Sequence, residues 1–154
     1  MALLNAALAK GNDSGMYVTF LLGALDLAGN RLAYVRAGHV PPYVRRADGS
    51  IERLEQLGGL PLGLKENAVY TSDTTAFAAG DAILLLTDGF TEAADPAGQL
   101  FGEDRITTFM QRADPGDHEL LSTLVRQVRD FEGGQPPSDD MAAILLSRRE
   151  DATG

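Results

Sequence analysis

This chain of 154 residues contains no cysteine, which excludes disulfides and thiolate zinc sites and is compatible with a reducing compartment. Long hydrophobic runs are also missing. The longest, such as "VTFLLGAL" and "AILLL", fall far below the roughly 20 residues that a membrane-spanning helix needs. No basic segment precedes the first apolar residues, so we expect no signal peptide. These absences together predict a cytoplasmic protein.

Basic residues are scarce, since 13 lysines and arginines face 22 aspartates and glutamates and the net charge is −9. Such a charge repels nucleic acid and anionic membranes, so we expect neither as a partner, but it does not repel divalent cations. Many soluble proteins are equally acidic, so a function must rest on particular carboxylates. The length fits a single domain, which we place at residues 1–149, with a flexible tail at 150–154.

Hydrophobic patterning predicts strands first, then helices, then one last strand. A short helix over 2–10 is followed by two hairpins, with turns near Gly29 and at Asp48-Gly49. Further strands are expected in "AVYTSDTTAF", in "AILLLT" and in "DDMAAILLS". Because "AILLL" does not alternate, we expect it to be covered on both faces. This order of elements predicts an α+β layered fold with antiparallel sheet.

Two helices are predicted between the last two strands. "EDRITTFMQR" places Ile106, Phe109 and Met110 on one helical face. "DHELLSTLVRQVRDF" should begin at an Asp117 cap. Its expected apolar face is formed by Leu120, Leu121, Leu124, Val125, Val128 and Phe131.

The stretch "LLLTDGFTEA" ends an apolar strand in Asp88, and Asp139-Asp140 stand just before another apolar strand. If the two strands are neighbours, these carboxylates meet at one end of a sheet. Mg²⁺ and Mn²⁺ prefer such oxygen ligands, and Gly89 would allow the backbone to come close to the metal. A pair of ions can activate a water for attack on a phosphoryl group. The alternative is that Asp-Gly and Asp-Asp are ordinary turn and loop residues.

The two histidines carry less information. His39, in "AGHVPP", stands at the junction between two predicted elements. It could donate a proton, bind a metal or form loop hydrogen bonds. Glu92 could support the aspartates through a hydrogen bond or could be a solvated surface residue. His118 lies at the start of a predicted exposed helix, and we assign it no role.

An ordered set of motifs extends from about Asn12 to Arg148. It comprises "SGMYVTFLLGALDLAGNRLAYVRAGHVPPYVRRADGSIERL", "GLPLGL", "GDAILLLTDGFTEA", "LFGEDRI" and "DDMAAILL". The set resembles SpoIIE/RsbU-type serine/threonine phosphatases, which belong to the metal-dependent protein phosphatase (PPM) superfamily. The resemblance implies a sandwich of two antiparallel β-sheets flanked by helices in α/β/β/α layers. It also implies two Mn²⁺ or Mg²⁺ ions.

The same resemblance implies roles for particular residues. Asp88 of "TDG" and Asp139 of "DD" correspond to metal ligands of the catalytic site, and the adjacent Gly89 and Asp140 are further candidate metal ligands. "AGH" occupies the place of an Ala-Gly-Asp element near the metals in related phosphatases, so His39 is a candidate for the catalytic site. The implied reaction is hydrolysis of phosphoserine or phosphothreonine on a small anti-anti-sigma (STAS-type) protein.

The sequence departs from the family in one respect. Family members carry an earlier hairpin with a Gly-Gly-Asp element whose aspartate bridges the metals, and nothing before Asn12 matches it. We therefore expect a fold that is incomplete at its N-terminus, with weaker metal binding. Missing strands would leave sheet edges open, which favours a homodimer. An inactive pseudophosphatase that binds a regulatory partner is the alternative to an active enzyme.

Overall fold

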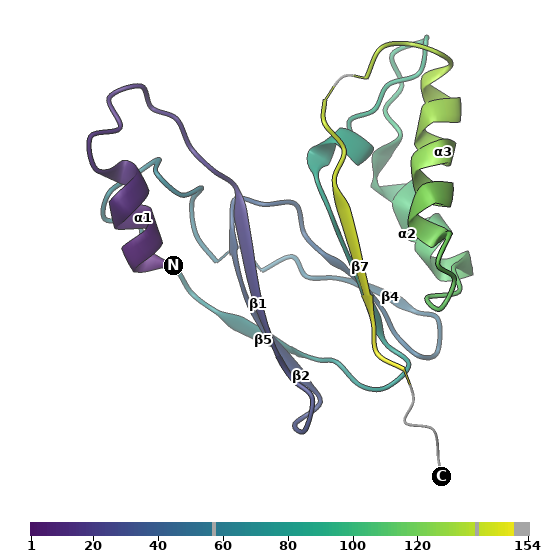
Figure 1. Cartoon of the computed structure of the whole chain (residues 1–154), viewed down its shortest axis with the longest axis horizontal. Coiled ribbons are helices and arrows are strands. Elements are labelled where there is room, and N and C mark those ends of the chain that lie inside the picture. The colour runs from purple at the N-terminus through teal and green to yellow at the C-terminus, as the bar shows by residue number, and fades with distance from the viewer. Residues whose placement is uncertain (57, 138, 150–154) are drawn as a thin grey trace. The chain divides into compact units, whose positions relative to one another are not determined.

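The computed structural model describes residues 1–56, 58–137 and 139–149 (Figure 1). Its internal contacts separate into two compact units, each described by itself below. The first contains Met1–Pro41 and Glu55–Ala78, and the second contains Pro42–Leu54 and Ala79–Gly154. The single domain at 1–149 stays a prediction, and the tail at 150–154 lies outside the described residues. No helix in the described ranges has the length and apolar character needed to cross a membrane.

The first unit contains a three-stranded antiparallel sheet in the order β1-β2-β5. Its elements are helix α1 (Ala2–Ala9) and strands β1 (Phe20–Asp26), β2 (Arg31–Ala37) and β5 (Asp73–Ala76). The predicted hairpin is confirmed, because β1 and β2 pair along their whole length and Asn30 adopts the positive φ of 53° that the turn requires. The last of these strands begins only at Asp73, so the predicted strand over 68–77 was too long.

The buried residues of this sheet lie in strand β2. Leu32 and Tyr34 of β2 are 5% and 4% exposed, whereas Ala24, Ala33 and Thr74 on the opposite face are exposed. Strand β1 lies at the edge of the sheet and is exposed over most of its length. Leu22 and Leu25 of β1 are therefore exposed, one on each face of the sheet.

Helix α1 is held to the loop at 58–72 by one buried side chain. Asn5 is 1% exposed, and its amide nitrogen donates to the carbonyls of Lys65 and Glu66, each at 2.9 Å. Its amide oxygen accepts from the Gly63 N–H at 2.9 Å and from the Tyr70 hydroxyl at 3.0 Å. A buried amide with all these bonds satisfied fixes the helix against the "GLPLGL" loop.

The second unit contains a four-stranded antiparallel sheet in the order β4-β3-β6-β7. These strands are β3 (Tyr43–Arg45), β4 (Ile51–Arg53), β6 (Ala82–Leu86) and β7 (Ala143–Ser147). The prediction that "AILLL" is covered on both faces is confirmed, since only Leu85 of β6 is more than marginally exposed. Gly49, with φ at 86°, forms the predicted turn between β3 and β4.

Helices α2 (Gly102–Arg112) and α3 (Leu120–Glu132) belong to the same unit, where α2 contacts β3 and β4 and α3 contacts β7 (Figure 1). Ile106, Phe109 and Met110 are buried, as predicted. The expected buried face of α3 was too wide, because Val125 is 36% exposed. The α+β class with two antiparallel sheets and flanking helices is confirmed.

The predicted cap of α3 is wrong. The helix begins at Leu120 with Glu119 as its N-cap residue, and no side chain caps it. The Asp117 carboxylate instead accepts from the Glu119 N–H at 2.9 Å, while the Leu120 N–H donates to the Asp117 carbonyl at 3.2 Å. Asp117 therefore stabilises the turn that precedes the helix.

Candidate metal centre

The two aspartate motifs meet because β6 and β7 are antiparallel neighbours. Their register pairs Leu86, the last residue of β6, with Ala143, the first residue of β7. The segment that leaves β6 therefore runs beside the segment that enters β7. This places Asp88 and the Asp139-Asp140 pair at the same end of the four-stranded sheet, as the sequence predicted for neighbouring strands.

Thr87 holds these two segments together. Its hydroxyl donates to the Asp140 carbonyl and accepts from the Ala142 N–H, both at 3.0 Å. Its own N–H donates to the Ala142 carbonyl at 3.0 Å. Sequence reasoning missed this residue. Its role could have been predicted from its type and position, because a threonine hydroxyl between an apolar strand and an aspartate readily forms hydrogen bonds with nearby backbone.

Gly89 allows the two segments to approach each other. A Cβ atom at this position would lie 2.5 Å from the Asp140 carbonyl oxygen, which no side-chain carbon tolerates. Gly89 and Phe90 are buried in a short 3₁₀ helix, η1 (Asp88–Phe90), whereas Asp88 is exposed. The absence of a side chain at 89 therefore sets the spacing between the motifs.

The first residue of η1 is Asp88, and its backbone is fixed by the turn. Its carbonyl accepts from the N–H groups of Thr91 and Glu92, at 2.9 and 2.8 Å, and from the Thr91 hydroxyl at 3.1 Å. Its carboxylate is on the exposed side, as are Asp139 and Asp140. Asp139 accepts from the Asp140 N–H at 2.7 Å. Rigid backbone with exposed carboxylates suits a site that receives a hydrated cation.

The donor chemistry fits a hard divalent ion, but the described residues do not complete a cluster. Carboxylates and the closely approached backbone around Gly89 are oxygen donors of the kind that Mg²⁺ and Mn²⁺ take, together with water. Within 1–56, 58–137 and 139–149, however, no three carboxylate, histidine or cysteine side chains lie close enough to hold one ion. Asp88 and Asp139 stay candidate metal ligands, and a complete site would need donors beyond those that the described residues bring together.

His39 lies in the first unit, whereas Asp88 and Asp139 lie in the second. Its Nδ1 is 3.2 Å from the Val40 carbonyl oxygen, and its own carbonyl accepts from Arg36 Nη1 at 2.7 Å. The preceding Gly38 has φ at 69° and no room for a Cβ, which would lie 2.5 Å from Pro61. These contacts fix the "AGH" turn against the "GLPLGL" loop. The catalytic role of His39 stays a prediction.

Comparison with known proteins identifies the family. Residues 1–149 match the family model described as Stage II sporulation protein E (SpoIIE). Protein IcfG of Synechocystis sp. is 26% identical over 136 residues, covering 88% of this chain and 21% of that protein. Phosphoserine phosphatase RsbU of Bacillus subtilis is 25% identical over 150 residues, covering 95% of this chain and 43% of RsbU. The chain thus spans less than half the length of these curated relatives.

Solved structures show the same fold. The PP2C phosphatase domain of SpoIIE from Bacillus subtilis, solved with a fragment of its regulatory domain, gives a TM-score of 0.79 at 21% identity. That match covers 96% of this chain and 43% of the solved chain. The SiaA-PP2C domain of Pseudomonas aeruginosa gives 0.76 at 21% identity, covering 95% of this chain and 58% of the other. The present chain therefore shares the fold of these PP2C-type phosphatase domains.

Proposed function

This chain belongs to the SpoIIE family of PPM-type protein serine/threonine phosphatases, and from that membership we propose that it hydrolyses phosphoserine or phosphothreonine on a regulatory protein. The proposed substrate is a phosphorylated STAS-type anti-anti-sigma protein, and the proposed cofactor is Mn²⁺ or Mg²⁺. The observation that supports this most directly is the meeting of Asp88 and Asp139-Asp140 at one end of the β6-β7 pair. The relative named phosphoserine phosphatase RsbU points to the same chemistry.

The chain's own residues have distinct parts in this proposal. Asp88 and Asp139 provide carboxylates for the ion, and Asp140 and Gly89 provide nearby backbone. Thr87 keeps the two segments at a fixed separation. A bound divalent ion supplies an acidified water and neutralises charge on the phosphoryl group. No side-chain nucleophile is needed, so the protein's contribution is to hold the donors in place and to orient the phosphoprotein.

The test is phosphate release from a phosphoserine-bearing STAS-type protein, measured with and without Mn²⁺. Asp88→Asn removes a metal-binding charge, and Asp13→Asn, at an exposed aspartate of the first unit, is the matched control. We expect Mn²⁺-dependent release that Asp88→Asn abolishes and Asp13→Asn preserves. If the chain alone releases nothing, the same pair of variants is assayed in a longer protein that contains it. Metal-independent release, or release unaffected by Asp88→Asn, would contradict the proposal.

A second candidate is a pseudophosphatase that binds a signalling partner without turnover. The observation in its favour is that no group of three metal-binding side chains forms among the residues that the structure describes. This candidate predicts that the STAS-type protein binds equally well to the wild type and to Asp88→Asn, with no phosphate released by either. Binding that requires Mn²⁺ and the Asp88 carboxylate would exclude it.

We also propose that the chain associates as a homodimer. Strand β7 is an edge strand with Ile144 and Leu146 exposed by 57% and 44%, and β1 is an edge strand with Leu22 and Leu25 exposed by 49% and 44%. Open edges with apolar side chains favour pairing with another chain.

A further inference from the structure

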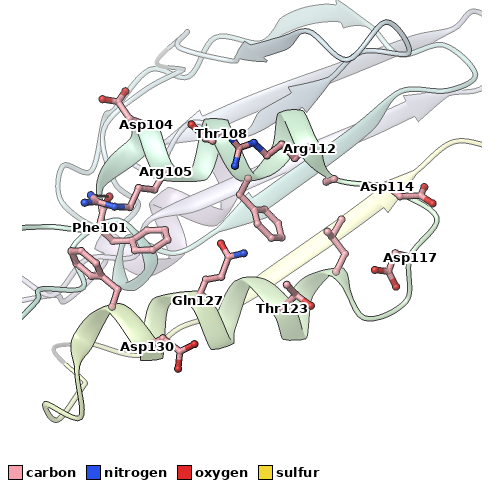
Figure 2. A pocket seen from close by; sticks show the side chains of 14 residues that line it. Phe101, Asp104, Arg105, Thr108, Arg112, Asp114, Asp117, Thr123, Gln127 and Asp130 are labelled. Atoms are coloured by element: carbon pink, nitrogen blue, oxygen red, sulfur yellow. Dashed lines mark hydrogen bonds between the residues drawn. The ribbon is translucent and has the colours of Figure 1, made fainter.

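A groove runs between α2 and α3, and we call it the α2–α3 groove (Figure 2). Its lining residues come from both helices and from the turn that joins them, all between Phe101 and Phe131. No residue of the candidate metal centre is among them. Its volume is about 1120 Å³. Because small-molecule sites measure about 300–1,000 Å³ and are largely enclosed, this open groove is better suited to a segment of another protein.

The floor of the groove is apolar. Phe109, Ala113 and Leu120 line it and are each less than 10% exposed. At one end the rings of Phe101 and Phe131 meet edge to face, with centroids 5.4 Å apart. Packed aromatic and aliphatic side chains of this kind form preorganised surface for an apolar ligand face.

The charged residues of the groove are predominantly acidic. Asp104, Asp114, Asp117 and Asp130 line it, against the arginines 105 and 112. Of the two arginines, Arg105 is already engaged. Its guanidinium carbon lies 4.6 Å from the Phe131 ring centroid, and its Nη1 donates to the Phe101 carbonyl at 2.8 Å. Four aspartates against two arginines leave the groove with a negative formal charge, which favours a cationic ligand.

We propose that the α2–α3 groove binds a basic amphipathic helix of a separate protein. Both walls are helices whose backbone groups are bonded internally, so an added β-strand has no edge to join, whereas a helix can place apolar side chains at i, i+3, i+4 and i+7 along the floor. The 11 residues of α2 span about 16 Å, which is the length of three turns. Lysines and arginines beside the apolar face would meet the aspartates.

Charge selects this occupant over the chain itself. Helix α1 has the sequence "ALLNAALA", which carries no basic residue, and its Asn5 is buried against the loop of its own unit. A basic amphipathic helix of a separate protein can contact the apolar floor and pair with the aspartates of the groove.

Figure 2 indicates the side chains to change. Gln127 points from α3 toward α2 across the groove, and Asp130 stands one turn further along α3. Substitutions at Gln127 and Asp130 leave the candidate metal centre unchanged, because its residues lie at 87–89 and 139–142. Asp130→Lys and Gln127→Lys bring positive charge to the groove. Glu66→Lys, at an exposed residue of the first unit, is the charge-matched control for Asp130→Lys.

The probe is a synthetic amphipathic peptide of about 14 residues, with leucines at helical spacing and lysines beside them, and its counterpart with glutamate for every lysine. Binding is measured by fluorescence anisotropy at low salt. We expect the lysine peptide to bind at least about tenfold more tightly than the glutamate peptide, and Asp130→Lys with Gln127→Lys to weaken it by about tenfold. Glu66→Lys should change binding by less than about twofold.

Amide chemical shifts of the wild type, recorded during the same titration, keep the test independent of variant folding. The proposal predicts that the lysine peptide shifts resonances of α2 and α3. Shifts confined to other elements, equal binding of both peptides, or unchanged binding to the folded groove variants would overturn it. Self-association that the groove variants abolish would also overturn it, because the occupant would then be a second copy.

Discussion

At the scale of single residues, Thr87 joins the two segments of the candidate metal centre through its hydroxyl. Its hydroxyl bonds to the backbone on both sides of Met141, at Asp140 and Ala142. Valine has the same shape but loses both hydrogen bonds, which are exposed to solvent, at a cost of about 0.5–1.5 kcal/mol for each bond. Serine keeps the hydroxyl.

We predict that Thr87→Val weakens Mn²⁺ affinity by about tenfold or more, as loss of a group that orients metal ligands commonly does. Thr87→Ser should retain affinity within about threefold. Isothermal titration of Mn²⁺ into folded variants measures both. If the valine and serine variants behave alike, Thr87 has only a packing role.

Gly89 gives a second prediction. Because a Cβ there would lie 2.5 Å from the Asp140 carbonyl oxygen, Gly89→Ala must push the Asp139-Asp140 segment away from η1. We expect a loss of about 1–3 kcal/mol in the free energy of unfolding, from overpacking against backbone. Urea denaturation checks this, with Gly98→Ala as control. Gly98 has φ at 79° and open space around it, so its substitution carries backbone strain but no clash.

The sequence predicted which two aspartate motifs would meet, but it did not predict the Thr87 hydrogen bonds that join their segments. Asp88 and Asp139-Asp140 were predicted as site residues because hard cations take carboxylate ligands and because the motifs resemble those of the phosphatase family. Thr87 was missed because its role depends on the register between β6 and β7, which local sequence does not encode. His39 belongs to the first unit and the aspartates belong to the second, so local spacing cannot predict whether they share a site.

At the scale of elements, helix α1 is attached through hydrogen bonds more than through packing. Leu3, Leu4 and Leu8 are exposed by 90%, 41% and 40%, whereas Asn5 is buried. Asn5→Ala removes the partner of the Gly63 N–H and the Tyr70 hydroxyl and leaves those groups unsatisfied. The helix and the "GLPLGL" loop should therefore loosen together.

We predict that Asn5→Ala lowers the free energy of unfolding by about 2–4 kcal/mol, because several buried hydrogen bonds are lost at once. Hydrogen exchange should rise in α1 and at 61–70 before it rises in β2. Asn67→Ala, at an exposed residue of the same loop, is the control. Unchanged hydrogen exchange at Gly63 in Asn5→Ala would show that the Asn5 hydrogen bonds do not hold the loop.

Elements were predicted well where side-chain periodicity and turn residues agreed. The β1-β2 hairpin follows from the turn near Gly29 and the β3-β4 hairpin from its Asp-Gly turn. The covered strand β6 follows from an apolar run without alternation, and the apolar face of α2 follows from helical spacing. The errors are at boundaries. Asp117 looked like a helix cap, but Asp117 closes the preceding turn and α3 starts three residues later. The division of the chain into two sheets depends on long-range pairing, such as β2 with β5, that local patterns do not specify.

At the scale of the whole molecule, the exposed apolar strands predict association. We expect a sedimentation coefficient that increases with protein concentration, with a homodimer as the end state. Ile144→Lys with Leu146→Lys places charge on the exposed side of β7, where it should oppose strand pairing and shift the chain toward monomer. Leu3→Lys, at a residue 90% exposed on α1, is the control. A concentration-independent monomer in analytical ultracentrifugation would contradict this prediction.

The central claim is that a divalent ion binds where β6 ends and β7 begins. The most direct test is paramagnetic broadening of amide resonances by Mn²⁺, because it locates the ion without requiring turnover. The account predicts broadening at residues 87–90 and 139–142 in the wild type, and its loss in Asp88→Asn but not in Asp13→Asn. Broadening centred on other residues, or broadening at 87–90 that persists in Asp88→Asn, would contradict it.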